Sequence, residues 1–131
     1  MKKTLLFVKK YPLSVTLFVC IWVLSLTPFI PETRLSDVRF IDKWTHFVMY
    51  GGTCSIVWIE YWREHLRPDY EKLFFWAWLM PIAMSGLLEL LQEYCTCGHR
   101  SGDWLDLAAN ATGVTLAACL GLLFLKCFPK A

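Results

Sequence analysis

The sequence lacks the basic stripe and the aromatic pattern that mark proteins binding DNA or RNA. Its formal net charge is only +2 over 131 residues, so nucleic acid is not expected as a partner. Polar surface is also scarce, because 56% of the residues are hydrophobic, against about 45–50% in a soluble domain. An apolar chain rich in aromatic residues is typical of a membrane protein. The length fits a single domain, residues 1–131.

A signal-peptide cleavage site is also missing. The first apolar run, 13–30, carries no charge and is long enough to cross a bilayer. Four lysines precede it, as they would in a signal peptide, but no small-x-small motif follows. Pro28 and Pro31 follow instead and end the helix. We therefore expect residues 13–30 to be a retained first span.

Three more apolar segments, 43–62, 73–92 and 104–127, are separated by short polar connections. Spans joined by short loops predict an all-α integral membrane protein, an antiparallel four-helix bundle. Pro81 is expected to kink the third span, because proline removes a backbone hydrogen bond. Glu60 and His65 are interpreted as part of a solvated turn after the second span, without a role.

The lysines and arginines predict the orientation of the chain. If both termini are cytoplasmic, nine of the 13 basic residues lie inside and four lie outside. Positive charge collects on the cytoplasmic side of membrane proteins, so the N-in, C-in arrangement is favoured. The start of the second span, the end of the third and the start of the fourth then lie at the extracytoplasmic face.

A second pair of zinc ligands is absent as well. Cys95, Cys97 and His99 lie close together, but their spacing is too tight for the usual zinc pattern and no other ligand pair follows. We therefore expect no metal and no cofactor. Two cysteines one residue apart can also form a strained disulfide.

Polar side chains recur at helical spacing on three of the expected spans. Ionisable groups inside a membrane are costly, and by default they indicate a functional site. We expect the three polar faces to meet in a wet pocket, with Arg100 as its cation, paired with Asp103 or Asp106. The candidate pocket residues are Asp42, Lys43, His46, Tyr50, Glu89, Gln92, Arg100, Asp103, Asp106 and Asn110.

A purely structural interpretation competes with this pocket. Asp42 and Asp103 are also in the right place to cap helix starts, and the deeper polar groups could simply join helices by hydrogen bonds. Gly113, Ala117 and Gly121 form a small-xxx-small stripe on the fourth span. Such a stripe lets another helix approach closely, including a helix of a partner protein.

The order of the polar motifs resembles the VanZ-like family. The motifs are Asp42-Lys43-x-x-His46-Phe47-x-x-Tyr50, Glu89-x-x-Gln92, Arg100 and Asp103-x-x-Asp106-x-x-x-Asn110-x-x-Gly113. The family looks like small bacterial membrane proteins, and its founding member is linked to low-level teicoplanin resistance. The Cys-Thr-Cys-Gly-His insert before Arg100 departs from the short turn expected there.

The resemblance implies a protein of the bacterial inner (cytoplasmic) membrane whose outward pocket binds a membrane lipid head group or a lipid-linked cell-wall precursor. An intramembrane hydrolase or transferase is an alternative, with His46 and the carboxylates as base or metal ligands. No nucleophile–base pair is visible in the motifs. A structural subunit of a membrane complex is the third interpretation.

Overall fold

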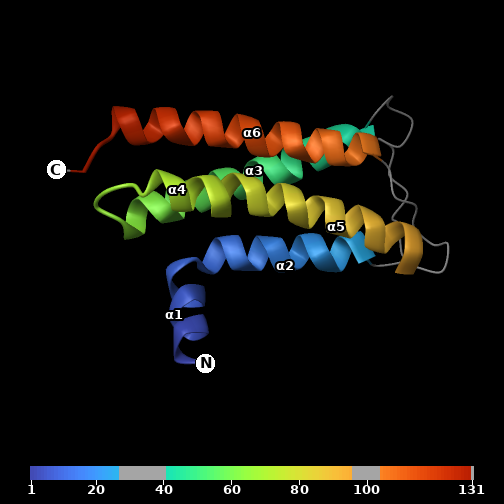
Figure 1. Ribbon diagram of the computed structural model, residues 1–131, viewed down its shortest axis with the longest axis horizontal. Helices are drawn as coiled ribbons and strands as arrows, with labels where there is room; N and C mark the ends of the chain where they lie inside the picture. The colour runs from blue at the N-terminus through green and yellow to red at the C-terminus, as the bar shows by residue number, and fades with distance from the viewer. Residues whose placement is uncertain (27–40, 96–103, 131) are drawn as a thin grey trace.

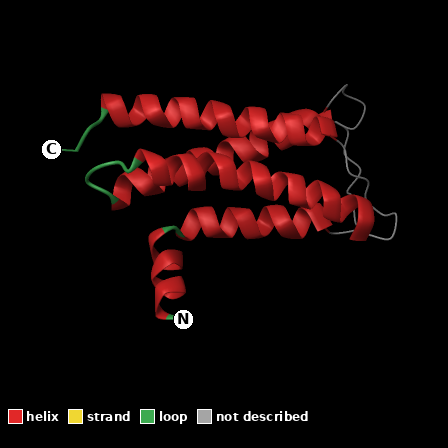
Figure 2. Cartoon of the chain, viewed as in Figure 1, coloured by secondary structure: helices red, strands yellow, loops and turns green. Residues whose placement is uncertain are grey.

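The computed structural model describes residues 1–26, 41–95 and 104–130, and within these it leaves out the side chains of Ile41 and Asp42. Every regular element in these ranges is a helix (Figure 2). In chain order the elements are α1 (Lys2–Lys10), α2 (Pro12–Leu26), α3 (Ile41–Glu64), α4 (Tyr70–Leu73), the π-helical segment η2 (Phe74–Leu79), α5 (Met80–Cys95) and α6 (Trp104–Cys127).

Two helical stretches are long and apolar enough to cross a membrane. They are Tyr70–Cys95, which joins α4, η2 and α5, and Trp104–Cys127, which is α6. A third results if α1 and α2 are counted as one span bent by 97°. These lengths and compositions identify a membrane protein.

The helix limits follow the sequence prediction most closely at α6, where the expected range 104–127 is confirmed as helix. The expected segment 43–62 lies within a longer helix, Ile41–Glu64. The third segment extends at both ends to Tyr70–Cys95. Of the first expected span, 13–30, the described part forms a helix as far as Leu26, and the remainder lies outside the described residues.

Pro81 follows directly after the π-helical segment. At the end of this segment the backbone N–H of Met80, the first residue of α5, bonds to the Phe75 carbonyl, five residues earlier. Proline lacks an N–H and its ring crowds the preceding turn, so the wider π geometry relieves that conflict. The irregularity that the structure shows beside Pro81 is this π-helical segment, and the predicted kink stays a prediction.

A sharp corner separates α1 from α2 (Figure 1). Pro12 is the first residue of α2, a position that suits proline because no helical N–H is needed there. The next two N–H groups, of Leu13 and Ser14, donate to the two carboxylate oxygens of Glu60, each at 3.0 Å. The Ser14 hydroxyl donates to the same carboxylate at 2.5 Å.

Glu60 is therefore an acceptor for the start of α2, and the interpretation as a solvated turn residue was wrong. Its side chain is almost fully enclosed, with 2% of the residue exposed. The first N–H groups of a helix need hydrogen-bond acceptors, and here the acceptors come from a neighbouring helix. His65, by contrast, does lie in the loop after α3.

The closest helix pair is α3 with α6, and the two run in the same direction. The contacts advance together along both helices: Lys43 with Asp106, Gly51 with Gly113, and Trp58 with Gly121. A Cβ atom at Gly113 would lie 2.5 Å from the Phe47 carbonyl oxygen. Only glycine allows this approach of the two backbones.

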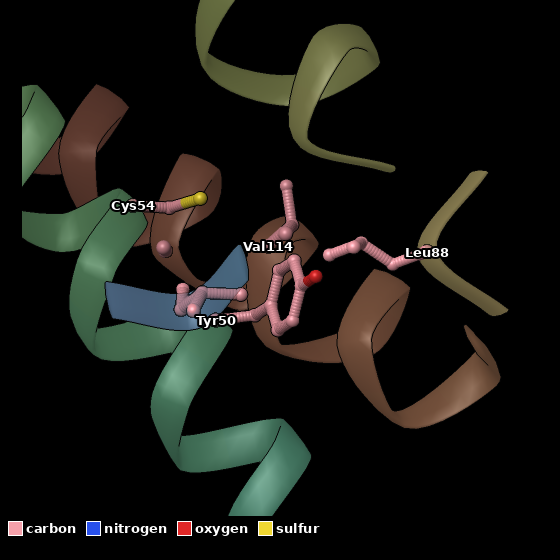
Figure 3. Close-up of a cluster of buried hydrophobic side chains, with 6 residues drawn as sticks. Tyr50, Cys54, Leu88 and Val114 are labelled. Atoms are coloured by element: carbon pink, nitrogen blue, oxygen red, sulfur yellow. The ribbon is translucent and has the colours of Figure 1, made fainter. Parts of the chain in front are cut away.

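The small-residue stripe thus faces α3 of the same chain. Gly113, Ala117 and Gly121 are all buried, and the Trp58 ring covers Gly121. The expectation that this stripe meets a separate membrane protein is corrected accordingly. Beside it, Tyr50 and Cys54 of α3 pack with Leu88 of α5 and Val114 of α6 in the central core (Figure 3).

Candidate functional site

The candidate site lies where α3 and α6 begin. Because the two helices are parallel, their first turns are neighbours, and Lys43 and His46 meet Asp106 there. The Lys43 Nζ atom lies 2.6 Å from Asp106 Oδ1, and His46 Nε2 lies 3.5 Å from Asp106 Oδ2. One carboxylate therefore joins an ammonium group and an imidazole ring across the helix pair.

These three side chains are neither fully buried nor fully exposed. The exposed fraction is 18% for Lys43 and His46 and 13% for Asp106. The His46 Nδ1 atom is buried and has no hydrogen-bond partner in the described part of the chain. One nitrogen of the imidazole therefore lies near a carboxylate, and no described protein group bonds to the other. A buried nitrogen without a hydrogen bond costs free energy unless a water or a ligand reaches it.

A second polar group lies deeper, between α3, α5 and α6. Asn110 Nδ2 donates to Ser85 Oγ at 2.6 Å, and Tyr50 shares a hydrogen bond with the same serine. Glu89 lies close enough to Tyr50 to act on it electrostatically. All four residues are at most 5% exposed. Hydrogen bonds between these helices hold their polar groups out of contact with lipid.

Ser85, at the centre of this deeper group, was not among the residues predicted from the sequence. The serine is four residues before Glu89 and seven before Gln92, so it lies on the same helical face. That spacing could have identified it. Ser85 was overlooked because a hydroxyl in a membrane helix can bond its own backbone, and it therefore carries a weaker signal than an acid.

Gln92 has a different partner from the other candidates. Its Nε2 atom donates to the Ser25 backbone carbonyl at 2.8 Å and so ties α5 to α2. Both residues are buried. This contact holds two helices together and does not belong to the Lys43, His46 and Asp106 group.

Three predicted site residues, the side chain of Asp42 and the whole of Arg100 and Asp103, lie outside the described residues. The predicted pairing of Arg100 with an acid therefore stays a prediction. Within the described part of the chain, Lys43 is the cation that pairs with Asp106.

Within 1–26, 41–95 and 104–130, no group of three or more His, Cys, Asp or Glu side chains is arranged to hold a metal ion. Cys95 is a free, exposed cysteine, whereas Cys97 and His99 lie outside the described residues. The ligands that the site offers are consequently an ammonium, an imidazole and a carboxylate at the start of a helix. A helix start carries partial positive charge and favours anions.

Comparisons of the chain with protein-family models, with curated proteins and with solved structures find no match.

Proposed function

We propose that the chain is a four-span, VanZ-like protein of the bacterial cytoplasmic membrane. Its function is to bind an anionic lipid head group, or the head group of a lipid-linked cell-wall precursor, at the extracytoplasmic face. The contact of Asp106 with Lys43 and His46 carries this proposal, because it gathers one motif from α3 and one from α6 into a partly open group.

The chemistry of the group suits a phosphate. Lys43 supplies a compact positive charge, and the paired starts of α3 and α6 add their dipoles in the same direction. Asp106 orients the ammonium and the imidazole ring, and His46 Nδ1 is a polar atom that a ligand oxygen can satisfy when that nitrogen carries its proton. The resemblance to the VanZ-like motifs supports a precursor of the cell wall as the source of that phosphate.

The four-span, antiparallel arrangement with both termini in the cytoplasm is also part of the proposal. The basic residues favour it. The C-terminus lies at the same end as the α1–α2 corner and the α3–α4 turn, as this topology requires (Figure 1). Labelling of intact cells tests it with Tyr94→Cys and Leu66→Cys, two positions that are 79% and 74% exposed. In a background without the native cysteines, an impermeant maleimide should label the former and miss the latter; the reverse result would place the site in the cytoplasm.

The function is tested by a matched pair of acid-to-amide variants. Asp106→Asn should weaken binding of a short-chain polyprenyl phosphate to the purified protein by roughly tenfold, about 1.4 kcal/mol. It should also abolish any shift in teicoplanin susceptibility that the wild-type chain confers. Glu71→Gln, an exposed position on α4, is the control. Unchanged binding in Asp106→Asn, at normal expression and thermal stability, would refute the head-group site.

The contact between His46 and Asp106 also favours one alternative, an intramembrane hydrolase or transferase. A carboxylate beside an imidazole orients the ring and supports its action as a base. His46→Gln distinguishes the two functions when the wild-type protein is incubated with the same polyprenyl phosphate. Mass spectrometry that detects a released or transferred group, lost in His46→Gln, would establish the enzyme; an intact lipid that still binds would establish the binding protein.

A further inference from the structure

A large apolar groove lies far from the candidate site, between α2 on one side and η2 with α5 on the other. Its volume is about 760 Å³, within the range of roughly 300–1,000 Å³ that ligand pockets occupy. Side chains from α3 also contribute to its lining. Apolar residues form most of this lining, among them Phe18, Trp22, Val57, Met80 and Met84.

The groove exists because α2 is fixed to the other helices at its two ends. At its first residues α2 is held by Glu60 of α3, and at its last residues by Gln92 of α5. The π-helical segment and the proline at the start of α5 contribute to the lining between these two attachments. The groove opens to the surface, since its lining residues Trp76 and Leu87 are 59% and 47% exposed.

Positive charge is concentrated at one end of this groove. Lys10, which ends α1, and Lys72 of α4 both line it and are both exposed. Lys72 also forms an exposed ion pair with Asp69, at 3.4 Å between Nζ and Oδ2. Three further lysines, Lys2, Lys3 and Lys9, lie on α1, which has no buried residue. α1 also carries exposed apolar side chains, among them Leu5 and Phe7. A basic helix with exposed apolar residues suits the surface of a membrane.

We propose that the groove binds one anionic phospholipid from the leaflet beside α1. An acyl chain fills the apolar part between α2 and α5, and the phosphate lies between Lys10 and Lys72. Charge complementarity selects this occupant, because juxtamembrane lysines attract anionic lipids. The groove is open sideways to the bilayer, so a chain can enter it from the surrounding leaflet without crossing a polar barrier.

The position of the acyl chain is tested by photo-crosslinking in nanodiscs. The probe is phosphatidylglycerol with a diazirine near the end of one acyl chain, and mass spectrometry maps the labelled peptides. Labels should concentrate on α2 and α5 at the groove. Ala83→Trp, an exposed lining position, should reduce this labelling several-fold, whereas Ala108→Trp, an exposed alanine of α6 outside the lining, should not.

The charge selection is tested by two double variants with equal change in net charge. Lys10→Gln with Lys72→Gln should reduce groove labelling by roughly tenfold, because each lysine contributes about a factor of three or more. Lys2 and Lys126 are not part of the lining, so the double variant Lys2→Gln with Lys126→Gln should keep most of the groove labelling. Addition of unlabelled phosphatidylglycerol should compete for the site, and phosphatidylcholine should compete poorly.

Four outcomes would overturn the proposal. Labels spread evenly over the exposed leucines of α6 would indicate only a general lipid shell. If phosphatidylcholine competes as well as phosphatidylglycerol, the groove does not select an anionic head group. The same follows if both lysine double variants lose the same share of the labelling. If the groove is not labelled and native mass spectrometry shows a dimer, the groove is occupied by a second copy of the chain.

The result is separable from that of the head-group site. Lys43 and Tyr61 are 18 residues apart on α3, which places them roughly 27 Å apart along the helix. Asp106→Asn should leave the groove labelling unchanged. Either proposal can therefore fail while the other holds.

Discussion

Glu60 and Asp106 are both acids held between two helices, but their surroundings differ. Glu60 is 2% exposed and accepts three hydrogen bonds from Leu13 and Ser14, two of them from backbone N–H groups. Asp106 has a side chain that is 13% exposed, and its partners in the described part of the chain are the side chains of Lys43 and His46. One carboxylate completes a helix start, and the other orients groups that remain within reach of water or a ligand.

The difference shows how to separate structural from functional acids in a membrane protein. A carboxylate that satisfies backbone donors cannot be exchanged without leaving those donors unpaired. A carboxylate paired with a long cationic side chain can lose its charge more cheaply, because the cation can extend toward water. We therefore expect the two sites to respond oppositely, with large stability effects at Glu60 and large binding effects at Asp106.

The largest expected effect comes from Glu60→Ala. It leaves the buried N–H group of Ser14 and the partly buried N–H group of Leu13 without an acceptor, at a cost of about 4 kcal/mol. Unfolding in SDS titrations of the purified protein measures it. A loss below about 1 kcal/mol would mean that water or another side chain replaces Glu60, and the contrast with Asp106 would fail.

Gly113→Ala should have the next largest effect. The added methyl group would meet the Phe47 carbonyl oxygen and push α3 away from α6, which costs about 2 kcal/mol. Gly52→Ala is the control, because a Cβ atom there has no neighbour within 4 Å. Alanine has a higher helix propensity than glycine, so Gly52→Ala should raise the stability slightly. Equal behaviour of the two variants would contradict the close contact between these helices.

Ser14→Ala should cost about 1 kcal/mol, since it removes one of the three hydrogen bonds that Glu60 accepts. Thr16→Ala is the matched control on the same helix. The Thr16 hydroxyl donates only to the Pro12 carbonyl within α2, in an exposed position. The same SDS titration measures both, and a larger loss for Thr16→Ala would locate the stability of α2 elsewhere.

The smallest change in stability is expected for Asp106→Asn, less than about 1 kcal/mol. The amide oxygen can still accept from Lys43, and Lys43 is partly open to water. Glu60→Gln is the matched acid-to-amide variant at the enclosed site, and it should lose several times more. If Asp106→Asn unfolds the protein as readily as Glu60→Gln, the first turns of α3 and α6 form a structural joint and not a binding site.

The extent of α6 could be predicted from the sequence because a long apolar run between polar residues has little other explanation. The contact of His46 with Asp106 was partly predictable, since each residue lies on a polar helical face. The pairing of Lys43 with Asp106 could not be predicted. Helical spacing shows which residues share a face of one helix, but it does not show which helices pack together.

Glu60 was missed for the same reason. It precedes Arg63 and Glu64, and such a charged segment is typical of a solvated turn. One signal was present: α2 begins Pro12-Leu13-Ser14 with no acidic residue in its first turn, so an enclosed start would need an acceptor from elsewhere. The amphipathic α1 was also missed, because its lysines were counted only for their charge.

The parallel pairing of α3 with α6 has a consequence for biosynthesis. α3 is not among the helices apolar enough to be identified as spans in the described part of the chain, and it carries Lys43, His46 and Glu60. Its main packing partner is α6, which is synthesised after α5. During synthesis, part of the polar face of α3 therefore lacks its hydrogen-bond and ion-pair partners until α6 has been inserted. Chains truncated before Trp104 should thus be held by the insertion machinery or degraded.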